Sequence, residues 1–200
     1  VPDLKSLLND NKATDAKRLA GLWALEGLKA VNTDLLVQLS KSSQATFRHE
    51  AARIAGEMLL PESDFLKVME AIKDDPHFRV RAAVINAVRL HRAASPAMVA
   101  ITAGYAKEPL TGKDRDGYDR DFERYLVRWA MAKHPEATKK MLAEIKLTDE
   151  AMALAARSFE GEEGAVMLVR ILDKMKRALA VQELGLLCKH IKNPVILEAL

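Results

Sequence analysis

The sequence predicts an all-α protein, an α-solenoid of stacked antiparallel helix pairs with about five repeats and a C-terminal helical cap. Similar segments recur at a spacing of 31 residues, which is the signature of a repeat array. Apolar residues return at helical intervals, whereas alternation at every second residue, typical of strands, is absent. The apolar residues, 49% of the chain, are mostly Ala and Leu, and this mixture favours closely packed helices over a sheet.

Three aligned segments carry the repeat. They begin at Ala16, Phe47 and Phe78. A fourth begins at Phe122, displaced by a further 13 residues, and places Trp129 where the first places Trp23. Because the two tryptophans occupy equivalent repeat positions, we expect both to have the same packing role in or near the interior.

Each repeat is predicted to contain two helices. The first helices are expected at residues 2–10, 32–41, 62–73 and 96–107, and the second helices at 14–29, 44–59, 76–92 and 118–133. A fifth pair is expected at 135–146 and 148–159, and shorter helices at 163–175, 179–191 and 194–200. We therefore expect one domain over 1–200, with regular repeats in 1–146, a loop insertion at 107–118, and less regular helices in 147–200, because terminal repeats are often atypical.

Equivalent apolar positions predict the face of each repeat that packs on its neighbours. They are Leu4, Leu35 and Leu66 in the first helices, and Ala20, Ala51, Ala82, Trp23, Ile54, Ile85, Leu28, Leu59 and Leu90 in the second. Helix starts are predicted from capping residues and prolines. The expected starts are at Asp75-Pro76, Ser95-Pro96, Asn193-Pro194, Thr14, Asn32, Ser43, Thr148, Pro61 and Pro135.

Composition restricts the classes of function. The chain has 31 basic and 28 acidic residues, so its net charge of +3 does not indicate a polycation directed at nucleic acid. Cys188 stands alone, which excludes an internal disulfide. No apolar run approaches the ~20 residues that span a bilayer. The chain begins at Val1 inside a helical pattern, and we expect it to be a fragment of something longer or a processed chain.

A row of basic residues is the main candidate for a partner-binding surface. Lys17, Arg48 and Arg79 occupy one repeat position, and Arg18 and Arg81 lie beside it. Stacked repeats would align these groups toward an acidic partner or a phosphate backbone. The alternative is that each Arg pairs with an acid or carbonyl of the adjacent repeat. Interleaved aromatic residues for base stacking are missing, and this favours the structural alternative.

No cofactor or metal site is predicted. The acids around Gly117 do not match a calcium loop, because the glycine comes fourth from Asp114 rather than sixth. We expect the last of these acids to stabilise the N-terminus of the following helix instead. The five histidines lack the spacing of a zinc pair, and nucleophile or phosphate-loop motifs are absent. The segment is therefore predicted not to be an enzyme and to have no small-molecule substrate.

With its paired helices, the chain resembles a HEAT-type α-solenoid over about residues 1–146. HEAT repeats carry Asp and Arg at fixed places; Arg48 and Arg79 fit, Lys17 departs conservatively, and the Asp recurs loosely at Asp15 and Asp75. More narrowly, three segments resemble the HEAT region of large bacterial membrane-bound dehydrogenase-like proteins. These segments are Leu22–Leu28, Asp74–Arg81 and Phe122–Ala130.

In that family a β-propeller precedes the HEAT region and a cytochrome c domain follows it. The resemblance implies a spacer between a redox catalyst and its electron acceptor, in the periplasm. None of the family's catalytic or haem-binding motifs lies within this chain, so no such residue can be assigned here.

The leading functional hypothesis is a non-enzymatic scaffold for protein–protein or inter-domain interaction, without membrane insertion. The alternative is a HEAT-like nucleic-acid-binding protein that resembles an alkylated-base glycosylase. That class needs a basic groove with exposed aromatic residues. The near-neutral charge and the expected burial of Trp23 and Trp129 argue against it.

Overall fold

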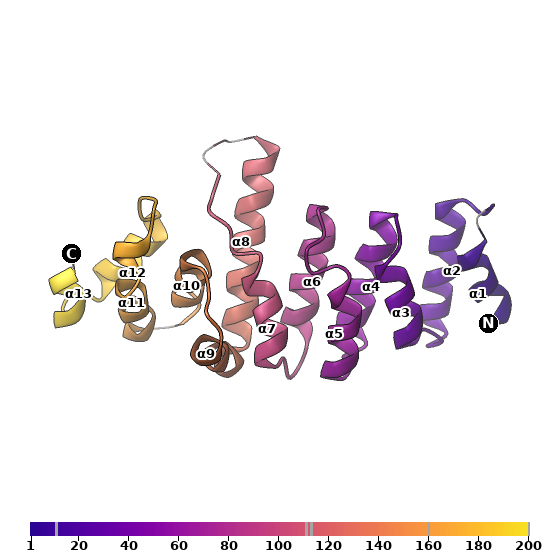
Figure 1. The fold of residues 1–200 in the computed structure, drawn as a ribbon, viewed down its shortest axis with the longest axis horizontal. Helices are drawn as coiled ribbons and strands as arrows, with labels where there is room; N and C mark the ends of the chain where they lie inside the picture. The colour runs from indigo at the N-terminus through magenta and orange to yellow at the C-terminus, as the bar shows by residue number, and fades with distance from the viewer. Residues whose placement is uncertain (11, 111, 113, 160, 200) are drawn as a thin grey trace. The chain divides into compact units, whose positions relative to one another are not determined.

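The structure, a computed structural model, describes residues 1–10, 12–110, 112, 114–159 and 161–199. The regular secondary structure of these residues is entirely helical, which confirms the all-α prediction (Figure 1). None of the described helices is long and apolar enough to cross a lipid bilayer. The contacts of the chain group into two compact units, Val1–Ala87 and Val88–Leu200, which we call unit 1 and unit 2. That the chain forms one domain stays a prediction.

Unit 1 holds the helices that carry the 31-residue repeat. They are α1 (Pro2–Asn9), α2 (Asp15–Gly27), α3 (Thr33–Ser40), α4 (Ala45–Glu57), α5 (Glu62–Glu70) and most of α6 (Phe78–Leu90). Helix α1 packs on α2, α3 packs on α4, and α5 contacts both α3 and α4. The predicted pairing of a first with a second helix is thus present in the first two repeats.

Unit 2 contains the longest described helix. Its helices are α7 (Pro96–Ala103), α8 (Arg115–Lys133), α9 (Pro135–Glu144), α10 (Asp149–Ala156), α11 (Glu162–Val169), the 3₁₀ turn η1 (Leu172–Lys174), α12 (Val181–Lys189) and α13 (Pro194–Ala199). Helices α7, α8 and α9 pack on one another, α10 joins α8 to α11, and α11 contacts α12 and α13. Because α8 begins at Arg115, the last four residues of the predicted loop at 107–118 are helical; Thr111 and Lys113 of that loop lie outside the described residues.

The second helices of unit 1 are not spaced by a constant 31 residues. They begin at Asp15, Ala45 and Phe78, which are 30 and 33 residues apart. The fourth position of each helix is therefore Arg18, Arg48 and Arg81, so Arg79 is not equivalent to Arg48 as predicted. Likewise the buried Phe47 corresponds to the buried Val80, whereas Phe78 opens its helix.

The predicted interior face is confirmed in part. Ala51, Ile54 and Ile85 are buried, but Ala20 is exposed and Leu28 is 60% exposed. Leu28 lies outside the core because α2 ends at Gly27. Leu90, at the end of α6, is 46% exposed, and Leu4, Leu59, Leu66 and Ala82 are half-buried.

Most predicted helix starts are confirmed by capping hydrogen bonds. Thr14, Asn32, Ser95 and Thr148 each accept a bond from a backbone N–H of the first turn. Asn193 does the same for Val195 N at 2.9 Å, and Pro135 occupies the first position of α9. Ser43 was wrong by one residue, since Gln44 precedes α4. The start at Pro76 was also wrong: Asp75 bonds to His77 N, and α6 begins at Phe78.

Candidate functional site

Three of the predicted partner-binding residues, Arg18, Arg48 and Arg81, form bonds within unit 1. Arg48 Nη1 and Arg81 Nη1 each lie 2.8 to 3.1 Å from the carbonyl oxygens five and six residues earlier in the chain. Arg18 Nε lies 2.9 Å from the carbonyl oxygen of Leu8. The guanidinium at the fourth helical position therefore fastens the preceding segment to its helix.

Arg48 also forms an ion pair with Asp75, which precedes α6. Arg48 Nη2 lies 3.1 Å from Asp75 Oδ1, and the Asp75 side chain is only 3% exposed. Burial would raise the pKa of Asp75, but hydrogen bonds from Arg48 and from the backbone N–H of His77 lower it below its usual value. This contact matches the structural alternative, in which the row of arginines pairs with acids and carbonyls of the adjacent repeat.

The other two predicted residues are exposed. Lys17 and Arg79 form no ion pair within the described part of unit 1. Arg79 lines a pocket of about 310 Å³ together with Trp23, His49 and Glu50. The structure therefore does not gather all five residues into one accessible surface, and their binding of an external partner stays a prediction.

Glu50 joins α2 and α4 at the wall of that pocket. Its side chain is 8% exposed and accepts hydrogen bonds from Trp23 Nε1 at 2.9 Å and Arg53 Nη2 at 2.8 Å, with His49 Nδ1 at 3.0 Å. Arg53 in turn binds Glu26 of α2 at 2.6 Å. Burial would raise the pKa of Glu50, but the hydrogen bonds from His49, Arg53 and Trp23 outweigh it and lower this pKa to about 2.

Replacing Glu50 with Gln should lower the free energy of unfolding by roughly 1 to 3 kcal/mol at pH 7. A carboxylate whose folded pKa is depressed from 4.5 to about 2 contributes stability above pH 4.5 and loses it as the pH falls toward 2. The difference between wild type and Glu50→Gln should therefore shrink over this range. Urea unfolding at several pH values measures it, with the exposed Glu57→Gln as control; a difference that is constant with pH would contradict the argument.

The prediction that both tryptophans are interior is wrong. Trp23 is 51% exposed and Trp129 is 40% exposed. The fully buried positions of α2 are Leu22 and Leu25, and a helical residue next to Leu22 is rotated by about 100°, which places Trp23 at the edge of the buried face. There its indole N–H bonds to Glu50. Trp129 occupies the corresponding edge of α8.

Trp129 belongs to a set of exposed aromatic side chains on α8, which we call the aromatic ridge. The ridge consists of Tyr118, Phe122, Tyr125 and Trp129, which are 72%, 42%, 45% and 40% exposed. Spacings of four, three and four residues place them on one helix face. Ring centroids of Phe122 and Tyr125 lie 6.2 Å apart, and those of Tyr125 and Trp129 lie 5.7 Å apart. Contiguous exposed aromatic surface of this kind marks an interaction site.

Two arginines lie over the rings of the ridge. The guanidinium carbon of Arg89 is 4.0 Å from the ring centroid of Trp129, and that of Arg128 is 5.5 Å from the ring of Tyr125. These are cation–π distances, at which each ring and guanidinium attract one another. The ridge is therefore both apolar and positively charged along its C-terminal part.

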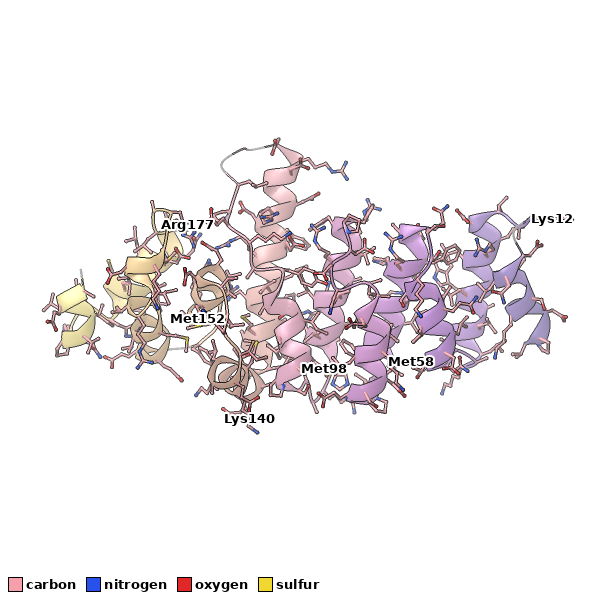
Figure 2. All side chains as sticks on the ribbon, viewed as in Figure 1. Lys12, Met58, Met98, Lys140, Met152 and Arg177 are labelled. Atoms are coloured by element: carbon pink, nitrogen blue, oxygen red, sulfur yellow. The ribbon has the colours of Figure 1, made fainter. Side chains whose placement is uncertain are left out.

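Beside the ridge, two buried carboxylates hold two arginines. Glu150 accepts hydrogen bonds from Arg124 Nη1 at 2.7 Å and Arg177 Nε at 2.6 Å. Arg177, labelled in Figure 2 before α12, also binds both oxygens of Glu183 at 2.8 Å. Burial would raise the pKa of both carboxyls, but the hydrogen bonds from Arg177 reverse this and lower their pKa values.

A pocket of about 310 Å³ lies next to this network, and we call it the arginine pocket. It is lined by Pro109, Asp121, Arg124, Tyr125, Arg128, Arg157, Ala180 and Gln182. Within the described residues, neither Arg128 nor Arg157 forms an ion pair. Burial lowers the pKa of Arg157, and repulsion by the neighbouring arginines lowers it further against the attraction of Glu183.

The acidic residues around Gly117 lie at the start of α8. Asp114 Oδ1 accepts a hydrogen bond from Gly117 N at 2.9 Å, and Asp116 lies in the first turn. Their predicted role in stabilising this helix N-terminus is thus confirmed. Among the residues with described positions, no group of three or more His, Cys, Asp or Glu is arranged to hold a metal ion.

The sequence interpretation missed both the ridge and the arginine pocket. The aromatic spacing at 118, 122, 125 and 129 is visible in the sequence and could have revealed the ridge. The pocket had no such signal, because its lining comes from four separate segments. A scan against protein-family models, a search of curated proteins and a search of solved structures each find no match.

Proposed function

We propose that this chain is a non-enzymatic helical-repeat scaffold that binds a protein segment through the aromatic ridge. The observation that carries the proposal is the exposure of four consecutive aromatic side chains on one face of α8. Tyr, Trp and Phe supply much of the binding energy of protein interfaces, because each buries a large rigid surface on association. The adjacent Arg89 and Arg128 add the other side chain that interfaces favour.

Photo-crosslinking tests the ridge. A photoreactive amino acid replaces Tyr118, the most exposed ridge residue, in the protein expressed in its native host. The control carries it at the exposed Lys140 of α9, labelled in Figure 2. We expect a discrete crosslinked partner from position 118 that is missing from position 140. Identical patterns from the two positions would count against the ridge as a docking surface.

The repeat architecture that we propose is an α-solenoid of HEAT type. The pairing of α1 with α2 and of α3 with α4, and an arginine at the fourth position of α2, α4 and α6, support it. Small-angle X-ray scattering tests this proposal. A compact protein of this length has a radius of gyration of about 16 Å, and an extended repeat array should exceed that value clearly. A radius near 16 Å would rule the solenoid out.

We further propose that the chain is part of a larger multidomain protein, on the strength of the resemblance to dehydrogenase-like proteins. The resemblance predicts a redox partner domain and a location in the periplasm. A reduced-minus-oxidised absorption spectrum of the full-length protein tests it. A sharp haem c band is expected, and a flat spectrum would remove this family from consideration.

Nucleic-acid binding is the second candidate, and the ridge favours it more than the sequence suggested. Exposed aromatic rings next to arginines can stack on the bases of a single strand. However, Asp116, Asp119 and Asp121 lie on the same helix and would repel a phosphate backbone. Filter binding of an oligothymidylate at increasing salt tests it: a steep fall in affinity would support this candidate, and no binding at low salt would end it.

A further inference from the structure

The charges around the arginine pocket are not balanced within the described residues. Arg124 and Arg177 are neutralised by Glu150 and Glu183, whose oxygens they bind at 2.6 to 3.0 Å. Arg128 and Arg157 have no such partner among these residues. The carboxylate that attracts Arg157 is Glu183, and both of its oxygens are already engaged by Arg177.

Holding Arg157 in this place is unfavourable for the folded protein. Its side chain is partly buried, and Arg124, Arg128 and Arg177 all repel it. A charge that is removed from water without a partner destabilises the fold. Strain of this kind is often found at binding sites, where the ligand supplies what the protein lacks.

The pocket has the size and donors that an oxyanion requires. Its volume is about 310 Å³, and three guanidiniums and the single carboxylate of Asp121 line it. The planar guanidinium donates parallel hydrogen bonds that match carboxylate and phosphate oxygens. The first turn of α12 forms one wall through Gln182, and the positive end of a helix also favours an anion.

We infer that the arginine pocket binds one oxyanion, a carboxylate or phosphate group carried by the protein segment that lies on the aromatic ridge. This inference rests on the proposed function for the source of the anion. The two surfaces share Tyr125, which lines the pocket and stacks on the ridge, so that one short segment can reach both. Arg128 and Arg157 bind the anion, and Phe122 and Trp129 contact the apolar side chain beside it.

Nuclear magnetic resonance of the arginine Nε–H groups tests the pocket by itself. Inorganic phosphate replaces chloride at constant ionic strength and pH, so that only specific binding shifts the signals. We expect saturable shifts at Arg128 and Arg157. In Arg157→Gln the affinity should fall by about tenfold or more, as for loss of a charged hydrogen bond. The matched control is Arg170→Gln, which removes an exposed arginine at the end of α11 and should leave the affinity unchanged.

Thermal unfolding provides a second readout that does not depend on any ligand. Because Arg157 is repelled and unpaired among the described residues, Arg157→Gln should leave Tm unchanged or raise it by about 2 to 4 °C. Added phosphate should raise the Tm of wild type and not that of the variant. Non-saturable phosphate shifts that are the same in both proteins would overturn the inference, even if crosslinking from Tyr118 supports the ridge.

A blocked five-residue peptide with Glu on each side of Phe identifies the source of the anion. We expect it to shift both the pocket arginines and the ridge rings, whereas a version with Gln in place of Glu shifts only the rings. Phosphate binding without peptide binding would overturn the assignment to a protein segment in favour of a free phosphate. Tighter, salt-dependent binding of an oligothymidylate would overturn it in favour of nucleic acid.

Discussion

Replacing Arg177 with Gln should lower the free energy of unfolding by about 3 to 5 kcal/mol. Arg177 is the shared partner of Glu150 and Glu183, and the Glu183 side chain is fully buried. Without the guanidinium, Glu183 keeps only its bond from Ala180 N at 2.7 Å, and Glu150 keeps Arg124. Two carboxylates would then be buried with too few donors, which is far more costly than losing a surface ion pair.

The loss in Arg177→Gln should depend on pH. In the wild type the folded pKa values of Glu150 and Glu183 are lowered, so their contribution exists above the unfolded value of 4.5 and is lost as the pH falls below it. In the variant, burial raises the pKa of Glu183, so protonation favours the folded state. The difference should therefore be largest near pH 7 and shrink below pH 4.5. Urea unfolding measures it, with the exposed Lys176→Gln as control; equal losses in the two variants would refute the buried network.

Replacing Gly56 with Ala should lower the free energy of unfolding by about 1 to 3 kcal/mol. A Cβ added at Gly56 would lie 2.6 Å from the backbone α-carbon of Ala87 and 2.8 Å from its methyl group, which is too close for α4 and α6 to keep their separation. The helix propensity of Ala, better than that of Gly by up to about 1 kcal/mol, acts in the opposite direction and is outweighed. Chemical denaturation measures the net effect.

Gly27→Ala is the matched control for Gly56→Ala. Nothing lies within 4 Å of a Cβ at Gly27, near the end of α2, so the substitution should be neutral or stabilising by up to about 1 kcal/mol. Adding Ala87→Gly to Gly56→Ala relieves the clash with the Ala87 methyl group but not the clash with its backbone, and should restore only part of the loss. A Gly56→Ala protein as stable as Gly27→Ala would mean that these helices are not closely apposed.

Local sequence signals predicted the helices of this protein well. Caps such as Asn32 and Thr148 act within one turn of their helix, so their effect does not depend on the rest of the fold. Asp75 failed as a cap before Pro76 for a non-local reason. Its carboxylate is shared between His77 N and Arg48, which lies 27 residues earlier in the chain.

The repeat spacing was predicted less well than the repeats. A constant period of 31 aligns Phe47 with Phe78, whereas the structure aligns Phe47 with Val80 at the third position of its helix. Both of these residues are buried, so burial, not residue identity, defines the register. The loops before α4 and α6 differ in length, and a fixed period cannot represent that difference.

The candidate site was the least predictable part. Sequence reasoning selected arginines by repeat position, and three of the five prove to hold backbone carbonyls within unit 1. The arginine pocket instead combines Arg128 of α8 with Arg157 after α10 and Gln182 of α12. Only tertiary packing brings these residues together. Whether a given arginine is neutralised depends on carboxylates such as Glu150, which lies 27 residues before Arg177.

Each compact unit contains one of the two tryptophans, Trp23 in unit 1 and Trp129 in unit 2. Each indole also has a distinct quencher or polar neighbour, a carboxylate for the first and a guanidinium for the second. Two single-tryptophan proteins, Trp23→Phe and Trp129→Phe, would thus turn intrinsic fluorescence into a separate reporter for each half of the chain. Coincident melting transitions would show that both halves unfold as one cooperative block, and separated transitions would show that each half folds independently.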